Sequence, residues 1–227
     1  MQLSIVIPVM NEGANLKELL PGLHDVASRI AGDHEIVLID GGSVDDTCQV
    51  GQDCGAYVLR QKGRGYGAAL RDGFAAARGE YVLTLDGDMS HRPDFIPDMW
   101  DKRNTAEIVI ASRYTSGGSD DMTRLRRLLS RALNKFFTLG LSLPFRDISS
   151  GFRLYHASLL RSLDLESSNF DVLEEILIKS YTKGYKIVEV PFHYAQRKNG
   201  SSHVNLLMFG VSYLKTFKRM RRFRHTT

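Results

Sequence analysis

Short apolar runs alternate with amphipathic stretches along the first half of the chain, and this alternation constrains the fold more than any other feature. The runs predict strands over residues 3–9, 34–39, 56–59, 81–85 and 107–112. The stretches between them predict helices over residues 15–30 (interrupted near Pro21), from about 45, and over 65–77 and 94–102. Continuous runs rich in β-branched residues are typical of parallel strands covered on both faces. We therefore expect an α/β fold: a Rossmann-like, mostly parallel sheet with helices on both faces.

After Arg113 the regular alternation is lost. A Gly- and Ser-rich loop is expected over residues 114–121, followed by helices over 123–141, 157–162 and 172–183, strands over 152–155 and 185–190, and a closing helix over 204–223. The chain shows no internal repeat and no low-complexity linker. We therefore expect a single domain, divided only loosely at residues 113 and 203.

Carboxylates cluster where the predicted strands end. Asp40 follows the second strand, and Asp86 and Asp88 follow the fourth, separated by Gly87. In doubly wound sheets, ligands bind outside the carboxyl ends of the strands. Two carboxylates one residue apart can present oxygens to one divalent cation, which can in turn bridge diphosphate oxygens. An Asp-Gly-Asp sequence is also typical of a solvated turn, so the motif by itself leaves both interpretations open.

Two other segments near these strand ends are also open to a structural interpretation. Asp40 can have a purely structural role in the turn that follows it. It can equally accept hydrogen bonds from the N–H groups of a nucleobase, since a carboxylate is an acceptor. The Gly-rich stretch over residues 63–67 is a weak match to a dinucleotide-binding loop, because its spacing differs and it follows the third strand. A helix start or a loop that lets the backbone approach a ligand fits that stretch better.

Arg113, Arg126 and Ser130 would bring hydrogen-bond donors beside the carboxylates if the loop between them folds back. Arg suits phosphate because its planar guanidinium binds two oxygens at once. The competing interpretation is a solvated helix face, since residues 123–131 carry several Arg. The polar loop from Arg197 to His203 is ambiguous in the same way, and a lone His is more often a surface residue.

Basic residues are concentrated at the end of the chain. Residues 190–227 hold eight Lys and Arg and no Asp or Glu, whereas the rest of the chain is mildly acidic. The closing helix combines an apolar stripe with Lys and Arg elsewhere, which is typical of a helix lying at a lipid interface. A helix docked on the core with a basic outer face fits equally well. No nucleic-acid reader motif accompanies the basic residues, so we expect no nucleic-acid partner.

The same sequence predicts a cytoplasmic protein. No stretch reaches the ~18 apolar residues needed to span a bilayer, and the amino terminus enters a strand-like run directly. Cys48 and Cys54 lack metal-ligand spacing, so we expect two free thiols.

Six segments, taken in order, resemble the family 2 glycosyltransferases with the GT-A fold, and among them the dolichol-phosphate mannose synthase branch. They cover residues 4–12, 62–69, 85–93, 111–114, 150–155 and 189–203. The resemblance implies a nucleotide-sugar-binding half (1–113), an acceptor-binding and closing half (114–203) and a basic amphipathic helix (204–227) within one catalytic domain.

The resemblance also implies a role for each matching residue. The nucleotide sugar would be bound by Pro8, Met10, Glu12, Leu38, Asp40, Asp86, Gly87, Arg197 and His203. Asp86, Asp88 and Ser90 would hold Mg²⁺ or Mn²⁺ on its diphosphate. Asp88, Arg113, Arg126 and Ser130 would form the catalytic group, in which the last three receive the phosphate of a lipid acceptor. Arg197 and His203 would belong to a loop that closes on the donor.

Three positions depart from the family pattern. Gly41 stands where a second Asp is usual, and Met10 stands where an aromatic residue often stacks on the base. These two changes leave guanine and uracil both open. His203 replaces a usual Lys, which would make loop closure sensitive to pH, since His titrates near neutrality. The Gln-x-x-Arg-Trp motif of processive members is absent, which favours a single transfer.

The expected activity is inverting transfer of a hexose, mannose from GDP-mannose, onto a polyprenyl or dolichyl phosphate. The partners would be the donor, the lipid phosphate and an anionic membrane surface that the protein contacts peripherally on its cytoplasmic face. The alternative within the family is a UDP-sugar enzyme with a hydroxyl acceptor, which needs a general base such as Asp171, Glu174 or Glu175. A third hypothesis is a catalytically silent protein that binds membranes through its basic tail.

Overall fold

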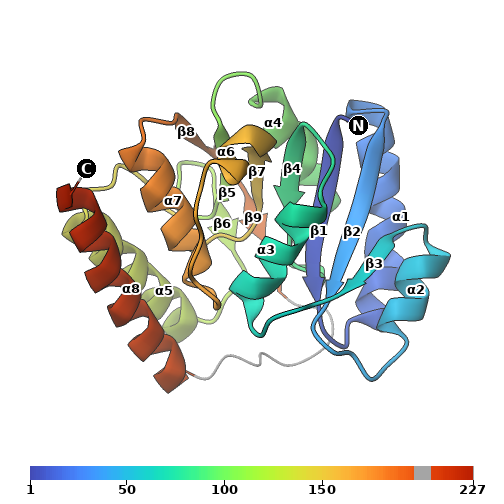
Figure 1. Ribbon diagram of the computed structural model, residues 1–227, viewed down its shortest axis with the longest axis horizontal. Coiled ribbons are helices and arrows are strands. Elements are labelled where there is room, and N and C mark those ends of the chain that lie inside the picture. Colours follow the sequence, from blue (N-terminus) through green and yellow to red (C-terminus); the bar gives the residue numbers. More distant parts are fainter. Residues whose placement is uncertain (197–205, 227) are drawn as a thin grey trace.

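The computed structural model describes residues 1–196 and 206–226 of the chain. The strands are β1 (Leu3–Val9), β2 (His34–Asp40), β3 (Tyr57–Arg60), β4 (Tyr81–Thr84), β5 (Ile108–Ser112), β6 (Ser119–Asp120), β7 (Arg153–His156), β8 (Ile187–Pro191) and β9 (His193–Tyr194). The helices are α1 (Gly13–Ile30), α2 (Thr47–Asp53), α3 (Tyr66–Ala76), α4 (Ile96–Asp101, after the 3₁₀ turn Pro93–Phe95), α5 (Arg124–Gly140), α6 (Ala157–Arg161), α7 (Val172–Thr182) and α8 (Leu206–Thr226). Figure 1 shows a central sheet flanked by helices, with α5 and α8 together at one end.

Seven strands form one sheet in the order β3-β2-β1-β4-β7-β5-β8, and β6 pairs with β9 in a small second sheet. β1 is parallel to β2 and β4, and β5 is parallel to β8. β7 lies between β4 and β5 and is antiparallel to both. The mostly parallel sheet is therefore confirmed, whereas the direction of β7 and the small second sheet were not apparent from the chain pattern.

The side chains of β1 alternate between two cores on opposite faces of the sheet. Leu3, Ile5 and Ile7 pack in one apolar cluster with residues of α1 and α4. Val6 packs in the other with residues of α3, α6 and α7. All four β1 side chains are fully buried, as expected for a parallel strand covered on both faces.

Helix α1 continues through Pro21, so the interruption expected there was wrong. Proline inside a helix removes one backbone hydrogen bond and crowds the preceding turn, at a cost of about 3 kcal/mol. Leu19, Leu20 and Leu23 around it are fully buried, and their burial offsets this cost.

Helices α5 and α8 lie side by side (Figure 1), and aromatic side chains fill the contact between them. The ring of Phe217 lies 4.5 Å from that of Phe136 and 5.5 Å from that of Phe137, measured between centroids. Gly140 permits this approach, because a Cβ there would lie 2.6 Å from the Phe217 ring. Tyr213 of α8 is also buried, so this helix docks on the rest of the protein through one side.

The two halves predicted to meet at residue 113 share the central sheet, since β1 to β5 belong to the first half and β7 and β8 to the second. The boundaries at residues 113 and 203 themselves stay a prediction. None of the helices, over the residues that the structure describes, is long and apolar enough to cross a membrane.

Candidate active site

The carboxyl ends of β2, β1 and β4 lie beside one another at one edge of the sheet. Asp40 ends β2 and pairs with Val9, the last residue of β1. Gly87 lies against the same edge, because a Cβ on it would be 3.1 Å from Val9 Cγ1 and 3.8 Å from Glu12 Cγ. The parallel strands thus bring Asp40, Glu12 and the turn over residues 86–88 to the edge where ligands bind in such sheets.

Asp40 is buried, and its carboxylate shapes the turn after β2. It accepts hydrogen bonds from the backbone N–H groups of Gly42 and Ser43 and from the Arg60 guanidinium, the last at 3.1 Å. Burial by itself would raise the pKa of this carboxyl. The hydrogen bonds from Ser43 and Gly42 and the charge of Arg60 outweigh burial and hold the pKa below its ordinary value. Contact between Asp40 and a nucleobase stays a prediction.

The other residues predicted for the nucleotide pocket differ in exposure. Pro8 is half-buried, Met10 is 49% exposed, and Glu12 is half-buried with its Oε2 accepting a hydrogen bond from Asn15. Leu38 is fully buried and lies against Gly51 of α2, where an added Cβ would be 2.5 Å from Leu38 Cδ1. Leu38 therefore belongs to the core and offers no surface that a ligand could touch.

The two carboxylates of the acidic turn, residues 86–88, have different surroundings. The side chain of Asp86 is 31% exposed, and the Tyr66 hydroxyl donates to its Oδ1 at 3.3 Å. Asp88 is buried, and its Oδ1 accepts from both the backbone N–H and the hydroxyl of Ser90. Met89 adopts a left-handed backbone conformation with φ of 66°, between these two residues. Ser90, expected to bind the metal, thus contacts and orients Asp88.

The acidic turn is suited to a metal ion that binds together with a diphosphate. Among the residues described, no three or more His, Cys, Asp or Glu side chains gather into a set that could hold a metal ion. Asp86 and Asp88 supply hard carboxylate oxygens, which suit Mg²⁺ or Mn²⁺, and such ions commonly take further oxygens from a bound phosphate. The donor set therefore fits a metal–diphosphate better than a resident metal.

His91, which the sequence analysis did not single out, is buried directly behind the acidic turn. Its Nδ1 accepts a hydrogen bond from the backbone N–H of Asp86 at 2.9 Å. Burial lowers the pKa of His91, although the charges of Asp86 and Asp88 oppose this effect. An Nδ1 that accepts from a backbone N–H carries no proton, so the ring is neutral with its hydrogen on Nε2.

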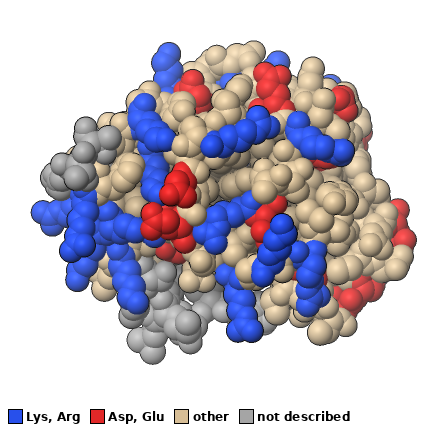
Figure 2. All heavy atoms as spheres, viewed as in Figure 1, with Lys and Arg blue, Asp and Glu red and all other residues tan. Residues whose placement is uncertain are grey.

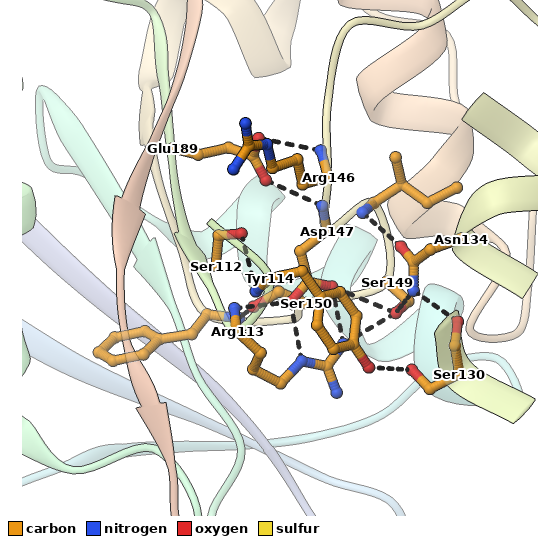
Figure 3. Close-up of polar contacts among 12 residues, drawn as sticks. Ser112, Arg113, Tyr114, Ser130, Asn134, Arg146, Asp147, Ser149, Ser150 and Glu189 are labelled. Atoms are coloured by element: carbon orange, nitrogen blue, oxygen red, sulfur yellow. Dashed lines mark hydrogen bonds and ion pairs between the residues drawn. The ribbon is translucent and has the colours of Figure 1, made fainter. Parts of the chain in front are cut away.

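Arg113, which follows β5, is held by a buried carboxylate that the sequence analysis also missed (Figure 3). Its Nε and Nη2 donate to the two oxygens of Asp147, each at 2.7 Å, and Nη2 also donates to Ser149 Oγ at 2.9 Å. Burial would raise the pKa of Asp147, but the charge and hydrogen bonds of Arg113 outweigh it and lower that pKa. Asp147 in turn raises the pKa of Arg113 above its ordinary value despite burial, so the pair stays ionised.

Tyr114 connects this ion pair to α5 (Figure 3). Its hydroxyl donates to Ser130 Oγ at 2.8 Å, and its ring centroid lies 5.1 Å from Arg113 Cζ. The Asn134 side chain donates to the Ser130 carbonyl and to Ser149 Oγ. Arg113 and Ser130 therefore belong to one hydrogen-bonded cluster. The sequence predicts this arrangement if the loop between the two residues folds back. Their contact with an acceptor phosphate stays a prediction.

Arg126, the third residue of that predicted group, is exposed on α5. Its charge acts on the hydroxyl of Tyr194, whose pKa it lowers against the larger effect of burial. The neighbouring Arg127 is engaged elsewhere, since its Nε donates to Asp120 at 2.8 Å. Arg126 is therefore exposed and close enough to Tyr194 for its charge to act there, whereas Arg127 is paired with Asp120.

Tyr194 in β9 joins the acidic turn to the Arg113 cluster. Its ring centroid lies 5.6 Å from Arg113 Cζ and 5.9 Å from that of His91. Burial and the charges of Asp86 and Asp88 raise the pKa of its hydroxyl, and Ser90 and Arg126 oppose this effect. The backbone N–H of the next residue, Ala195, donates to the carbonyl of Ser90. One tyrosine ring thus contacts both Arg113 and His91, the histidine behind the acidic turn.

A groove of about 300 Å³ opens beside the Arg113 cluster, lined by Tyr114, Arg131, Asn134, Lys135, Thr138, Phe145 and Arg146. It borders the outer side of α5, where Leu125, Leu128 and Leu139 are 68%, 65% and 69% exposed. Basic side chains are dense nearby: Figure 2 shows Lys and Arg gathered at the left, over α8. The half of the chain predicted to bind the acceptor thus combines an exposed apolar face with positive charge.

The three carboxylates considered as bases for a hydroxyl acceptor are all buried. Asp171 Oδ2 accepts from Thr216 of α8, and Glu175 pairs with Lys179 at 2.8 Å. Glu174 is fully buried, and neither of its carboxylate oxygens has a hydrogen-bond partner among the described residues. Burial of all three, together with the structural contacts of Asp171 and Glu175, weakens the case for any of them as a catalytic base.

Arg197 and His203 lie outside the described residues, so their predicted closure on the donor has no structural counterpart here. Of the residues that the sequence analysis missed, Asp147 had the clearest signal. It lies between the apolar residues Phe145 and Ile148, and an acid in such a segment needs a buried partner. His91 and Tyr194 carry no comparable local signal.

Comparison with known proteins relates the chain to characterised sequences. A family model described as "Glycosyl transferase family 2" matches residues 4–164. A dolichol-phosphate mannosyltransferase of Pyrococcus furiosus is 32% identical over 89% of this chain, which spans 59% of that relative's length. An undecaprenyl-phosphate mannosyltransferase of Micrococcus luteus is 30% identical over 90% of this chain and 88% of the relative.

The fold has a counterpart among solved structures. Glucosyl-3-phosphoglycerate synthase of Mycobacterium tuberculosis, solved with Mn²⁺, UDP and glucosyl-3-phosphoglycerate, superposes with a TM-score of 0.74. The two chains are 21% identical, over 98% of this chain and 79% of the synthase, so this likeness concerns the fold.

Proposed function

The chain belongs to glycosyl transferase family 2, and from this membership we propose that it transfers mannose from GDP-mannose to a polyprenyl phosphate, with inversion and with a divalent metal. One observation carries the proposal. A pair of acidic side chains and an arginine-centred cluster both lie close to a single ring, that of Tyr194. Such an arrangement suits two phosphate-bearing substrates, one bound through a metal and the other through cations.

The donor would lie at the acidic turn. Asp86 and Asp88 would hold Mg²⁺ or Mn²⁺, and the hydrogen bond from the Ser90 hydroxyl would fix the orientation of the Asp88 carboxylate. The bound metal would neutralise charge that develops on the departing nucleoside diphosphate. Pro8, Met10, Glu12, Asp40 and Gly87 would complete the pocket at the sheet edge, and Arg197 and His203 would close over the diphosphate.

The acceptor would lie on the other side of Tyr194. A phosphate monoester has its second pKa near ~6, so at neutral pH it is already a nucleophile and needs no general base. Arg113 is preorganised by Asp147, since a guanidinium held on two sides loses little freedom on binding. Arg113, Arg126 and Ser130 would together orient the phosphate toward the anomeric carbon.

A lipid acceptor also explains the outer side of α5. Leu125, Leu128 and Leu139 are exposed beside the basic groove, and this combination favours peripheral contact with an anionic membrane surface. The lipid phosphate would then reach the Arg113 cluster from the membrane. We place the protein at the cytoplasmic face, where nucleotide sugars would be supplied as donors.

Transfer can be tested with radiolabelled GDP-mannose, UDP-glucose and UDP-N-acetylglucosamine, each with and without a polyprenyl phosphate and Mn²⁺. The proposal predicts label in the organic phase only with GDP-mannose, lipid phosphate and metal together. Transfer of label from a UDP-sugar to a hydroxyl acceptor would contradict the proposal and support the alternative activity, that of a UDP-sugar enzyme. No turnover with any donor, together with retained vesicle binding, would favour a silent membrane-binding protein.

A further inference from the structure

The backbone N–H of Asp86 lies just beyond the hydrogen-bond ladder of the sheet. β4 ends at Thr84, and the N–H of Leu85 still donates to the carbonyl of Val6 in β1, at 3.4 Å. The next residue begins the acidic turn, and its N–H donates to His91 Nδ1 at 2.9 Å. A buried backbone donor must find an acceptor, so His91 supplies the one that the ladder no longer provides.

The ring that supplies this acceptor is fixed on several sides. It stacks on Phe152 with centroids 5.1 Å apart and planes 19° apart. Phe192 and Tyr194 contact it edge-on, at 5.7 and 5.9 Å. These aromatics come from the segment before β7 and from the β8–β9 region, so the ring position is set by parts of the chain remote from the turn.

A buried histidine is more often a packing residue than a functional one, and the aromatic box is consistent with that. Packing alone, however, requires only a flat ring of suitable size. The contact between Nδ1 and Asp86 N–H requires an acceptor at the δ position, and it acts on the residue whose carboxylate begins the acidic turn. Met89, which directly follows the acidic turn, adopts a left-handed conformation that by itself is unfavourable for a residue with a side chain.

We propose that His91 is a positioning residue: its Nδ1 holds the Asp86 backbone so that the carboxylates of Asp86 and Asp88 are preorganised for a metal–nucleoside diphosphate. This inference rests on the proposed function of the acidic turn. Groups that orient metal ligands from behind commonly change metal affinity by roughly 10- to 100-fold when they are removed.

The test compares three substitutions that all remove the ring. His91→Asn keeps an acceptor oxygen at the δ position, His91→Gln places its amide one atom further out, and His91→Ala has no acceptor. Binding of Mn²⁺ is measured by electron paramagnetic resonance with GDP and again with UDP, and the unfolding temperature is measured on the same samples. Phe95→Leu serves as a stability control, because Phe95 packs on Phe192 one layer away from the turn.

We expect all four variants to unfold at lower temperature than the wild type. Mn²⁺ affinity should fall roughly 10- to 100-fold in His91→Ala and His91→Gln, and stay within about threefold of wild type in His91→Asn and Phe95→Leu. Wild-type affinity in His91→Ala, or affinity that merely follows unfolding temperature across the four variants, would overturn the inference. Asp88→Ala separates the two proposals: if it binds Mn²⁺ and GDP or UDP like wild type, the metal site itself is wrong.

Discussion

The two sides of the molecule treat apolar side chains differently. On the side predicted to bind the nucleotide (residues 1–113), leucines such as Leu20 of α1 and Leu38 of β2 are fully buried. On the side predicted to bind the acceptor, α5 buries Phe137 but leaves Leu125, Leu128, Leu129, Phe136 and Leu139 at least 45% exposed. Formation of a hydrophobic core therefore accounts for the leucines of the first side. It does not account for the exposed apolar residues of α5.

Basic side chains lie beside the exposed face of α5. Arg131, Lys135 and Arg146 line the groove next to it. Contiguous exposed apolar residues rimmed by polar groups mark a binding surface. The combination of apolar and basic side chains is what the proposed lipid phosphate acceptor would require.

Catalysis should depend most strongly on the nucleotide side. Asp88→Ala removes a carboxylate from the acidic turn and should lower turnover roughly 10³-fold, measured as label transferred from GDP-mannose. Asp94→Ala is the matched control, because Asp94 is a nearby exposed acid paired with Arg92. A turnover for Asp88→Ala within tenfold of the control would show that the turn holds no essential metal.

The contrast in burial predicts that Leu→Ala will destabilise the protein strongly at a buried position and hardly at all at an exposed one. Leu20→Ala should lower the free energy of unfolding by about 2–5 kcal/mol, because it leaves a cavity in the core. Leu128→Ala should change it by no more than about 0.5 kcal/mol, since the side chain is 65% exposed. Urea unfolding measures both, and comparable losses would mean that α5 is held by its outer leucines.

Membrane attachment should depend on the acceptor side alone. Replacing both Leu128 and Leu139 with Glu removes two side chains worth about 1.5 kcal/mol each when buried in lipid, so vesicle binding should weaken on the order of 100-fold. Flotation with vesicles containing anionic lipid measures this. Val44→Glu is the control, since Val44 is 91% exposed on the nucleotide side. Equal losses in both variants would indicate general charge repulsion.

The contact between α7 and α8 should give the smallest effect, a dependence of stability on pH. Burial raises the pKa of Glu174 from 4.5 to about 8. Between these values the folded state keeps a proton that the unfolded state has lost, so stability falls as pH rises through this window. Relative to Glu174→Gln, wild type should lose on the order of 2 kcal/mol between pH 5 and 8.5, measured by urea unfolding.

Glu175→Gln provides the comparison for that experiment. Glu175 is equally buried, but hydrogen bonds from Lys179, Ser167 and the backbone of Glu166 outweigh burial and lower its pKa. Glu175 is ionised in the folded and the unfolded protein between pH 5 and 8.5. Glu175→Gln should therefore lower the free energy of unfolding by the same amount at both pH values. A wild type that instead gains stability at pH 8.5 would mean that Glu174 is ionised beside the buried Arg153.

Local pattern was sufficient for the element order and for part of the site. Strands β1, β2 and β5 were placed to within a residue or two from their apolar runs, because burial on both faces leaves a continuous apolar signature. Asp86 and Asp88 could be singled out because they follow such a strand directly. Where pattern failed, as at Pro21, packing of distant residues outweighed a local preference.

The sequence by itself determined the family, the mostly parallel sheet and the position of the acidic turn, since each depends on residues close together in the chain. Only the tertiary structure decided that Asp147 holds Arg113 across 34 residues, that His91 lies behind the turn in an aromatic box, and that β7 runs against its neighbours. It also decided that Leu38 is hidden and Leu128 is exposed. These features arise from contacts between distant segments, and no local period or spacing encodes which segments will meet.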